Sequence, residues 1–248
     1  MANHLTTIIL PVKDEHHPTL VKLLYDLERY GYQTIVVDDG STELVTGSDI
    51  RFDPPGRGYG AALKAGIDQA TTDLIATMDG DGQHTAWDVK RLEDFFLYFC
   101  NSYDGQSHQL DMVIGDRRLR ERGRRWVGRK VLNFVASLFA WRWIPDLNSG
   151  LRIFRRSVVT GYQPILCNGF SFTTSLTLSM LTDGYHVDWL PIKVHPRRQG
   201  HSKVRPWRDG WVTLKTILLI GIALRTRKLR MFMRPVISRL RVWLRGSR

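Results

Sequence analysis

The sequence predicts a Rossmann-like α/β fold, with a mostly parallel central sheet and flanking helices, followed by C-terminal amphipathic helices. An apolar run over residues 6–12, a helical pattern over 18–30 and a second apolar run over 33–37 follow one another. This β-α-β order predicts parallel strands joined by a right-handed crossover. A further apolar run, residues 74–77, ends at two carboxylates. The carboxyl ends of such strands are where ligands bind in open α/β sheets.

Length and composition favour one α/β domain with an appendage. The chain has 248 residues, of which 43% are hydrophobic, and we place the α/β domain at 1–205 and a basic amphipathic tail at 206–248. Cys100 and Cys167 show no metal or redox spacing, which favours a reducing compartment. The start lacks a secretory pattern, and no apolar run reaches the length of a spanning helix. We therefore expect a cytoplasmic protein.

The net charge of +12 is concentrated at the C-terminus. Residues 205–248 contain twelve Lys and Arg against the single Asp209. Within 231–245, Phe232, Val236, Leu240 and Leu244 recur at helical intervals between arginines, which is typical of a basic helix lying in a membrane interface. Nucleic acid also attracts such charge, but the apolar stripe fits lipid or a partner helix better. The tail therefore predicts binding to an anionic membrane surface.

The carboxylates that end the run at 74–77 are Asp79 and Asp81, with Gly80 between them and Gln83 two residues on. Hard oxygen ligands at a strand end suit Mg²⁺ or Mn²⁺ held together with a diphosphate. An ordinary Asp/Gly turn is the alternative for an isolated motif of this kind. The other motifs of the chain decide between the two.

Asp38 and Asp39 end the second strand, where a carboxylate can accept from a ribose or a base imide, or simply cap a turn. The first turn lacks G-x-G-x-x-G, so a dinucleotide is disfavoured. A glycine-rich loop at 56–60 opens a helix, and Arg57 is its best anion ligand. The small residues Gly60 to Ala62 indicate close packing of this helix on the sheet.

Together these motifs resemble family 2 glycosyltransferases, most closely the polyprenyl-phosphate sugar synthases. The matching segments, in order, are Pro11 with Glu15, Asp38-Asp39-Gly40-Ser41, Gly58-Tyr59-Gly60, Asp79-Gly80-Asp81-Gly82-Gln83-His84, Gly115-Asp116-Arg117-Arg118, Asp146-x-x-Ser149-Gly150-Leu151-Arg152 and Arg198-x-Gly200-x-Ser202-Lys203. Two positions depart from the family pattern: Asp116 replaces a serine, and Ser175 stands where a glutamate is usual. The identity of the acceptor therefore stays open.

The resemblance implies a GT-A fold that binds a UDP- or GDP-sugar with a divalent metal on its diphosphate. Asp79, Asp81 and Gln83 would hold the metal. The nucleotide-sugar set comprises Pro11, Glu15, Asp38, Asp39, Arg57, Asp79, Gly80 and Asp81. Asp81, Asp146 and Arg117 form the expected catalytic set. A metal stabilises the leaving diphosphate directly, so an inverting transfer needs no protein nucleophile.

The acceptor side is rich in cations: Arg117, Arg118, Arg152, Arg198 and Lys203 are the expected ligands of an acceptor phosphate. A lipid phosphate is already a nucleophile and needs positioning more than a base. A glycan, glycolipid or protein hydroxyl would need a base, for which Asp146 is the candidate. The ordinary alternative for each arginine is a surface ion pair.

An apolar, Trp-rich helical stretch at 126–143 follows a basic cluster at 120–125, which favours a membrane interface or, equally, a core helix. The prediction is a metal-dependent inverting glycosyltransferase that moves a sugar to a polyprenyl phosphate as a peripheral protein on the cytosolic membrane face. A homo-oligomer or a membrane partner subunit is also compatible with the apolar segments. The alternatives are transfer to a hydroxyl acceptor and a non-catalytic module that binds nucleic acid.

Overall fold

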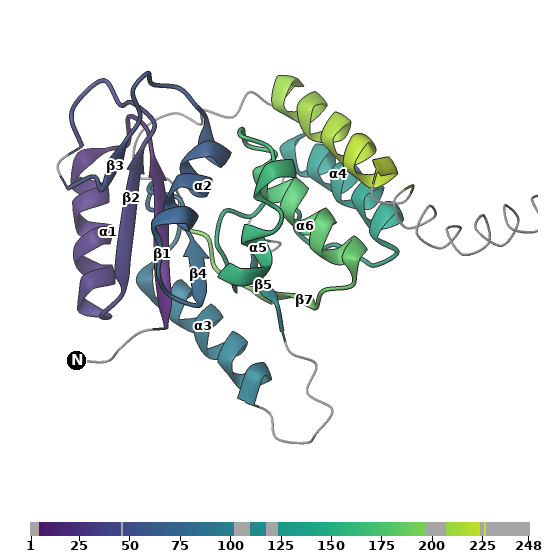
Figure 1. The fold of residues 1–248 in the computed structure, drawn as a ribbon, viewed down its shortest axis with the longest axis horizontal. Helices are drawn as coiled ribbons and strands as arrows, with labels where there is room; N and C mark the ends of the chain where they lie inside the picture. Colours follow the sequence, from purple (N-terminus) through teal and green to yellow (C-terminus); the bar gives the residue numbers. More distant parts are fainter. Residues whose placement is uncertain are drawn as a thin grey trace, which may run out of the picture.

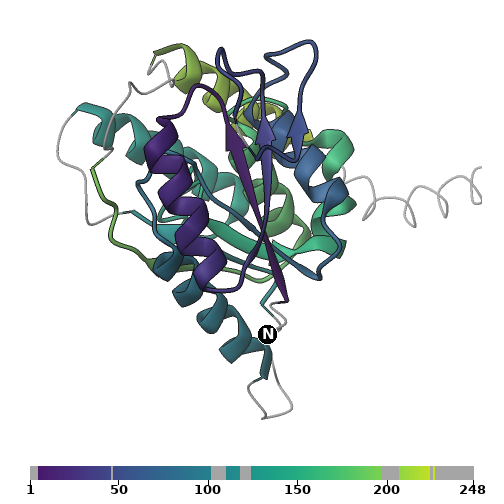
Figure 2. The same ribbon diagram turned by 90° about the vertical axis from the view of Figure 1, so that its left-hand side faces the viewer.

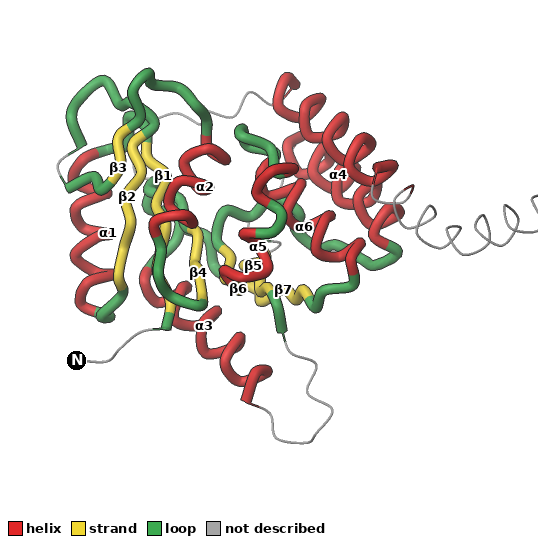
Figure 3. The backbone as a smooth tube through the Cα atoms, viewed as in Figure 1, coloured by secondary structure: helices red, strands yellow, loops and turns green. Residues whose placement is uncertain are grey.

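A seven-stranded sheet with the strand order β3-β2-β1-β4-β6-β5-β7 forms the centre of the protein (Figures 1 and 3). The computed structural model describes residues 5–45, 47–101, 110–117, 124–196, 207–223 and 226. The strands are β1 Thr6–Val12, β2 Gln33–Asp38, β3 Ile50–Arg51, β4 Leu74–Thr77, β5 Met112–Asp116, β6 Arg152–Arg155 and β7 Val187–Pro191. The runs predicted at 6–12, 33–37 and 74–77 are therefore confirmed as strands.

Strand β6 runs against the direction of the other strands. It pairs antiparallel with β4 on one side and β5 on the other, whereas β1 pairs parallel with both β2 and β4, and β5 pairs parallel with β7. The beginning of β6 consequently lies at the edge where its neighbours end. Thr77 of β4 and Ile114 of β5 both lie opposite Arg152, the first residue of β6. This reversal brings the loop before β6 to the carboxyl edge of the sheet.

Helices cover both faces of the sheet. They are α1 His17–Arg29, α2 Tyr59–Gln69, α3 Ala86–Asn101, α4 Arg124–Ala140, α5 Arg156–Thr160 and α6 Phe172–Asp183, with a short 3₁₀ helix at Gln163–Ile165 and a further helix over residues 207–223. Seen from the side, α1 lies on one side of β1 and β2, and α2 lies on the other (Figure 2). The predicted α/β fold with flanking helices is confirmed.

Successive residues of a strand point to opposite faces, so the sheet separates two apolar cores. Ile8 of β1 belongs to the core beneath α1 and α3, and Ile9 belongs to the core that contains residues of α2, α4, α5 and α6. Ile217, in the helix over residues 207–223, is fully buried in this second core. The first part of the predicted tail thus packs on the α/β domain, whereas residues 227–248 lie outside the described residues.

Glycine is required where the start of α2 approaches the loop before α6 and where its middle approaches β1. A Cβ on Gly60 would lie 2.2 Å from the carbonyl oxygen of Cys167, and one on Gly66 would lie 2.5 Å from Ile9. Gly58 has φ of 104°, and a Cβ there would lie 2.6 Å from the carbonyl oxygen of Asn168. The small residues at the start of α2 therefore serve packing, as the sequence predicted.

Candidate active site

The site lies at the carboxyl edge of the sheet, where the chain after β4, the end of β5 and the loop before β6 meet. β4 delivers Asp79 and Asp81 just after its last residue, and β5 ends immediately before Arg117. Because β6 is reversed, the loop containing Asp146 and Gly150 arrives at the same edge. Thr77 donates a 2.7 Å hydrogen bond to the carbonyl oxygen of Gly150, which joins that loop to β4. Motifs some 70 residues apart thus form one site.

Asp79 is partly buried and lies against two of the neighbouring motifs. Its Oδ1 accepts a 3.0 Å hydrogen bond from the hydroxyl of Tyr59, at the start of α2. A Cβ on Gly150 would lie 2.5 Å from Asp79 Oδ2, so any larger residue there would displace the Asp79 carboxylate. Burial and the nearby Asp79 charge raise the pKa of Tyr59 well above its usual value, so the phenol keeps the proton that it donates.

Asp81 is nearly buried, and its Oδ1 accepts a 3.0 Å hydrogen bond from the backbone amide of Gln83. No cluster of three or more His, Cys, Asp or Glu side chains that could hold a metal occurs in the described part of the chain. Mg²⁺ in nucleotide enzymes is commonly held by one or two carboxylates together with substrate phosphates. Asp79 and Asp81 fit that mode, in which the diphosphate supplies the remaining ligands.

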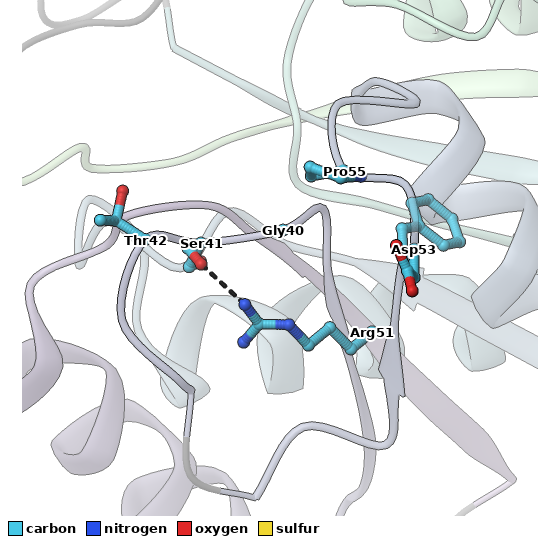
Figure 4. Close-up of a pocket in the computed structure, with 7 residues that line it drawn as sticks. Gly40, Ser41, Thr42, Arg51, Asp53 and Pro55 are labelled. Atoms are coloured by element: carbon cyan, nitrogen blue, oxygen red, sulfur yellow. Dashed lines mark hydrogen bonds between the residues drawn. The ribbon is translucent and has the colours of Figure 1, made fainter.

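Asp38 holds the loop beside a candidate nucleoside pocket. Its Oδ1 accepts hydrogen bonds of 2.8 and 2.6 Å from the amide and hydroxyl of Ser41, and its Oδ2 lies 3.1 Å from Arg51 Nη1. Arg51 also donates to the carbonyl oxygen of Ser41 (Figure 4). Gly40, Ser41, Thr42, Arg51, Phe52, Asp53 and Pro55 line a pocket of about 460 Å³. Asp38 is fully buried, so it supports the pocket-lining residues Ser41 and Arg51.

The glycine-rich loop is fastened to the end of β2 by Asp39. Its carboxylate oxygens accept from the amide of Gly58 at 3.1 and 3.2 Å, and Lys13 Nζ lies 3.6 Å from Oδ2. Arg57 is exposed; its guanidinium lies 4.9 Å from the ring centroid of Phe52 and donates to the carbonyl oxygen of Asp53. Arg57 therefore stands at the rim of the pocket beside Phe52 and Asp53.

Pro11 and Glu15 flank the same edge. Pro11 is buried in β1 opposite Val37 of β2. A Cβ on Gly80 would lie 3.7 Å from Glu15 Cγ, so Glu15 approaches the backbone between the two motif carboxylates. The end of β1 and the acidic motif are thus neighbours.

Arg117 and Asp146 form a two-pronged ion pair on the other side of the site. Arg117 Nε lies 2.8 Å from Asp146 Oδ2, and Nη2 lies 3.0 Å from Oδ1. Burial alone would raise the pKa of Asp146, but the Arg117 charge and its hydrogen bonds outweigh it and lower the pKa to about 2. Asp146 is consequently a weak base at neutral pH.

Arg152 is fully buried, which differs from the expected contact with an acceptor phosphate. Its guanidinium donates to the carbonyl oxygens of Leu147, Ser149 and Thr173 and to the Thr177 hydroxyl. It thereby ties the loop before β6 to α6. Burial lowers the pKa of Arg152 to about 10, so it remains cationic at neutral pH. The expected ligands Arg118, Arg198 and Lys203 lie outside the described residues.

The two positions that depart from the family pattern are both fully buried. Asp116 is the fully buried last residue of β5, and its carbonyl oxygen accepts from the amide of Ile192. Ser175 lies inside α6, where its hydroxyl donates to the carbonyl oxygen of Phe172 and accepts from the amide of Cys167. Ser175 therefore joins the loop at Cys167 to the first turn of α6.

Several residues of the site received no role from the sequence. Tyr59, Lys13 and Arg51 contact three of the predicted acidic residues. His84 is buried close to Asp81, and its Nδ1 has no hydrogen-bond partner among the described residues. Burial and the Arg117 charge lower the pKa of His84 to about 4, so its ring is neutral. Tyr59 could have been found from its position between two glycines within a motif.

The fold is that of GT-A glycosyltransferases. Among solved structures, glucosyl-3-phosphoglycerate synthase from Mycobacterium tuberculosis, in complex with Mn²⁺, UDP and phosphoglyceric acid, superposes with a TM-score of 0.65. The match covers 90% of this chain and 79% of that chain, at 16% sequence identity. At this identity the similarity establishes the fold.

The chain belongs to glycosyl transferase family 2, whose sequence model matches residues 7–162. The undecaprenyl-phosphate 4-deoxy-4-formamido-L-arabinose transferase of Pseudomonas fluorescens is 27% identical over 198 residues, covering 69% of this chain and 55% of the relative. The dodecaprenyl-phosphate galacturonate synthase of Rhizobium johnstonii is 27% identical over 174 residues, covering 62% and 48%. This chain thus spans about half the length of these relatives. The predicted family and the predicted glycosyltransferase class are confirmed.

Proposed function

We propose that the protein is a metal-dependent inverting glycosyltransferase that moves a sugar from a nucleotide-sugar to a polyprenyl phosphate on the cytosolic face of a membrane. One observation carries the proposal. The loop bearing Asp146, which pairs with Arg117, lies directly against the carboxylate of Asp79 through Gly150. A donor diphosphate at the acidic motif would therefore place its sugar next to an arginine suited to an anionic acceptor.

The donor side combines the acidic motif with the pocket beside Asp38. Asp79 and Asp81 would hold the divalent metal, while the pocket lined by Ser41, Arg51 and Phe52 would take the nucleoside. When bound, the metal stabilises the negative charge that develops on the leaving nucleoside diphosphate. Relatives named for polyprenyl-phosphate sugar transfer, and the neighbour solved with Mn²⁺ and UDP, support this assignment.

The ionisation of Asp146 favours a phosphate acceptor over a hydroxyl. A general base works best with a pKa near the working pH, and the pKa of Asp146 is about 2. A lipid phosphate already carries the negative charge of a nucleophile, so it needs orientation rather than deprotonation. In this mechanism Asp146 orients Arg117, and Arg117 aligns the acceptor phosphate.

The proposed membrane contact rests on two adjacent helices. A Cβ on Gly221 would lie 2.5 Å from the ring of Phe139, so the helix over residues 207–223 packs closely on α4. Trp207 and Trp211, in the helix over residues 207–223, are 88% and 70% exposed. Trp141, just after α4, is 83% exposed. Trp141 has φ of 52°, a conformation that glycine usually takes. Exposed tryptophans beside basic segments are typical of proteins that lie in a membrane interface.

No helix in the described ranges is long and apolar enough to cross a membrane. An in-plane contact by α4 and residues 207–223 would place the acceptor side of the site near lipid. Residues 227–248, with eight Lys or Arg and no Asp or Glu, would add attraction to anionic lipid of about 1 kcal/mol per basic residue near the surface.

The test uses the full chain with Mn²⁺ and radiolabelled UDP- or GDP-sugars, presented with polyprenyl phosphate in anionic vesicles. We expect label in the lipid fraction that mild acid releases, because a sugar joined to a lipid phosphate is acid-labile. Acid-stable label would instead identify a hydroxyl acceptor. The Asp79→Asn variant is the control for contaminating activity. No incorporation from any donor, with or without metal, would contradict the proposal.

A further inference from the structure

Asn133 holds the chain on both sides of Asp146. Asn133 lies in the middle of α4, and its Nδ2 donates a 2.6 Å hydrogen bond to the carbonyl oxygen of Pro145. Its Oδ1 accepts a 3.3 Å hydrogen bond from the amide of Leu147. One side-chain amide therefore pairs with the residues immediately before and after Asp146. Neither group of Asn133 is used within α4, so the pairing is directed entirely at this loop.

The remaining contacts of the loop complete this support. Trp189 of β7 donates from Nε1 to the carbonyl oxygen of Asp146 at 2.9 Å. One helical turn after Asn133, the hydroxyl of Ser137 accepts from the amide of Ile144 at 3.0 Å and donates to the carbonyl oxygen of Asn133. Trp189 and Asn133 thus fix the backbone at Asp146, whereas Ser137 fixes it two residues earlier. The carboxylate of Asp146 in turn orients Arg117.

A different side of α4 is apolar and exposed. Phe134, the next residue after Asn133, is 54% exposed, and Leu138 is 59% exposed. Successive helical turns place these two residues on one stripe, because four residues complete about one turn. Helix α4 therefore carries the exposed apolar stripe on one side and the amide that holds Asp146 on another. The contacts made by this stripe and the position of Asp146 therefore both depend on helix α4.

We infer that Asn133 is a positioning residue, through which α4 fixes Asp146 and couples lipid contact on its outer side to the Arg117–Asp146 pair. The lipid occupant of this stripe rests on the proposed function. Burial of Phe134 and Leu138 in an anionic lipid surface stabilises α4 against local opening, and the two hydrogen bonds of Asn133 transmit that stabilisation to residues 144–147. Without Asn133 the residues on either side of Asp146 lose their hydrogen bonds to α4, and Ser137 still joins the helix to the loop at Ile144.

Amide hydrogen exchange of the full chain tests the link without requiring turnover. In Asn133→Ala, exchange over residues 144–150 should rise about tenfold or more, since two hydrogen bonds of about 1 kcal/mol each are lost. The matched control Ser137→Ala removes a bond to the same loop from the same helix and should raise exchange mainly at Ile144. Asn133→Asp retains an acceptor for the Leu147 amide and should fall between wild type and Asn133→Ala, which guards against misfolding of the alanine variant.

Vesicles containing phosphatidylglycerol provide the second comparison. Their addition should slow exchange over residues 144–150 in the wild type and in Ser137→Ala, but not in Asn133→Ala. In the transfer assay, Asn133→Ala should lower kcat by roughly tenfold with unchanged donor Kd, because small misplacements of positioning groups are costly. Unaltered exchange over 144–150 in Asn133→Ala, or no response of the wild type to vesicles, overturns the inference. If exchange responds as expected but no sugar transfer occurs, the proposed reaction fails while the positioning role of Asn133 stands.

Discussion

The hydroxyl of Tyr59 donates to Oδ1 of Asp79 over 3.0 Å, which joins the start of α2 to the acidic motif after β4. The ring of Tyr59 also stacks on Phe170, with the centroids 5.6 Å apart. Phe170 precedes α6, whose residues Thr173 and Thr177 accept from Arg152. Tyr59 therefore links the proposed metal ligand to the segment that supports the acceptor side.

Replacing Tyr59 with phenylalanine should weaken the binding of Mn²⁺ with the donor. Hydrogen-bond partners that orient metal-binding carboxylates typically contribute about 10- to 100-fold to metal affinity, so we expect a loss of roughly tenfold or more in apparent Mn²⁺ affinity. Titration of Mn²⁺ in the presence of UDP, followed by calorimetry, measures this change. Phe170→Leu is the control, because it removes the stacking partner and leaves the hydroxyl in place. Equal Mn²⁺ affinity in wild type and Tyr59→Phe would show that the hydroxyl has no part in metal binding.

Asp79→Asn and Asp81→Asn should each lower metal-dependent turnover by roughly a hundredfold or more, since each removes a charged ligand of the proposed metal. The amide oxygen of asparagine still accepts the bonds from Tyr59 and from the Gln83 amide. The fold should therefore persist, and thermal unfolding should occur close to the wild-type temperature. Rates near those of the wild type with either Mg²⁺ or Mn²⁺, in both variants, would exclude the metal role.

Arg117→Ala should raise the acceptor KM or lower kcat while donor binding changes little. Breaking the pair also leaves the buried carboxylate of Asp146 without its cation, which costs about 3–5 kcal/mol of stability for buried pairs. The double variant Arg117→Ala/Asp146→Asn should recover stability but not activity. Chemical denaturation and steady-state kinetics separate the two effects. If donor affinity falls instead, Arg117 belongs to the donor-binding side of the site.

The pKa of Asp146 predicts a specific dependence of stability on pH. In the folded protein the pKa is about 2, below the ordinary value of 3.8. The ionised carboxylate therefore stabilises the fold at pH values above about 4, and this contribution is lost as the pH falls towards 2. The difference in unfolding free energy between wild type and Asp146→Asn, measured in urea, should be constant from pH 7 to about 5 and shrink below about 4. A difference that instead disappears near pH 6 would contradict the low pKa.

Deleting residues 227–248 should release the protein from anionic vesicles only in part. The deletion removes eight basic residues but leaves the exposed tryptophans of the helix over 207–223. Ile217 of that helix is in the core, so truncation from Trp211 would disturb the catalytic domain and is the wrong comparison. Cosedimentation should show weaker binding that salt affects less than in the full chain, because apolar burial is not screened. Complete release would assign the anchor to the deleted segment alone.

The sequence by itself determined the α/β class, the principal strands at the amino-terminal half and the positions of Asp79 and Asp81 at a strand end. These features depend on local periodicity and on where an apolar run stops, and both can be read along the chain. The family resemblance rested on motifs in register, and the family match confirmed it. The roles of the individual site residues remain predictions.

Tertiary structure decided which of the motif residues face one another. The reversed strand β6 brings Asp146 to Arg117 and Gly150 to Asp79, although no local pattern reveals the direction of a four-residue strand. The same packing buries Arg152 and directs Asn133 towards the loop around Asp146. Burial and partner choice depend on segments far apart in the chain, and the free energy that selects them comes from packing of the whole domain.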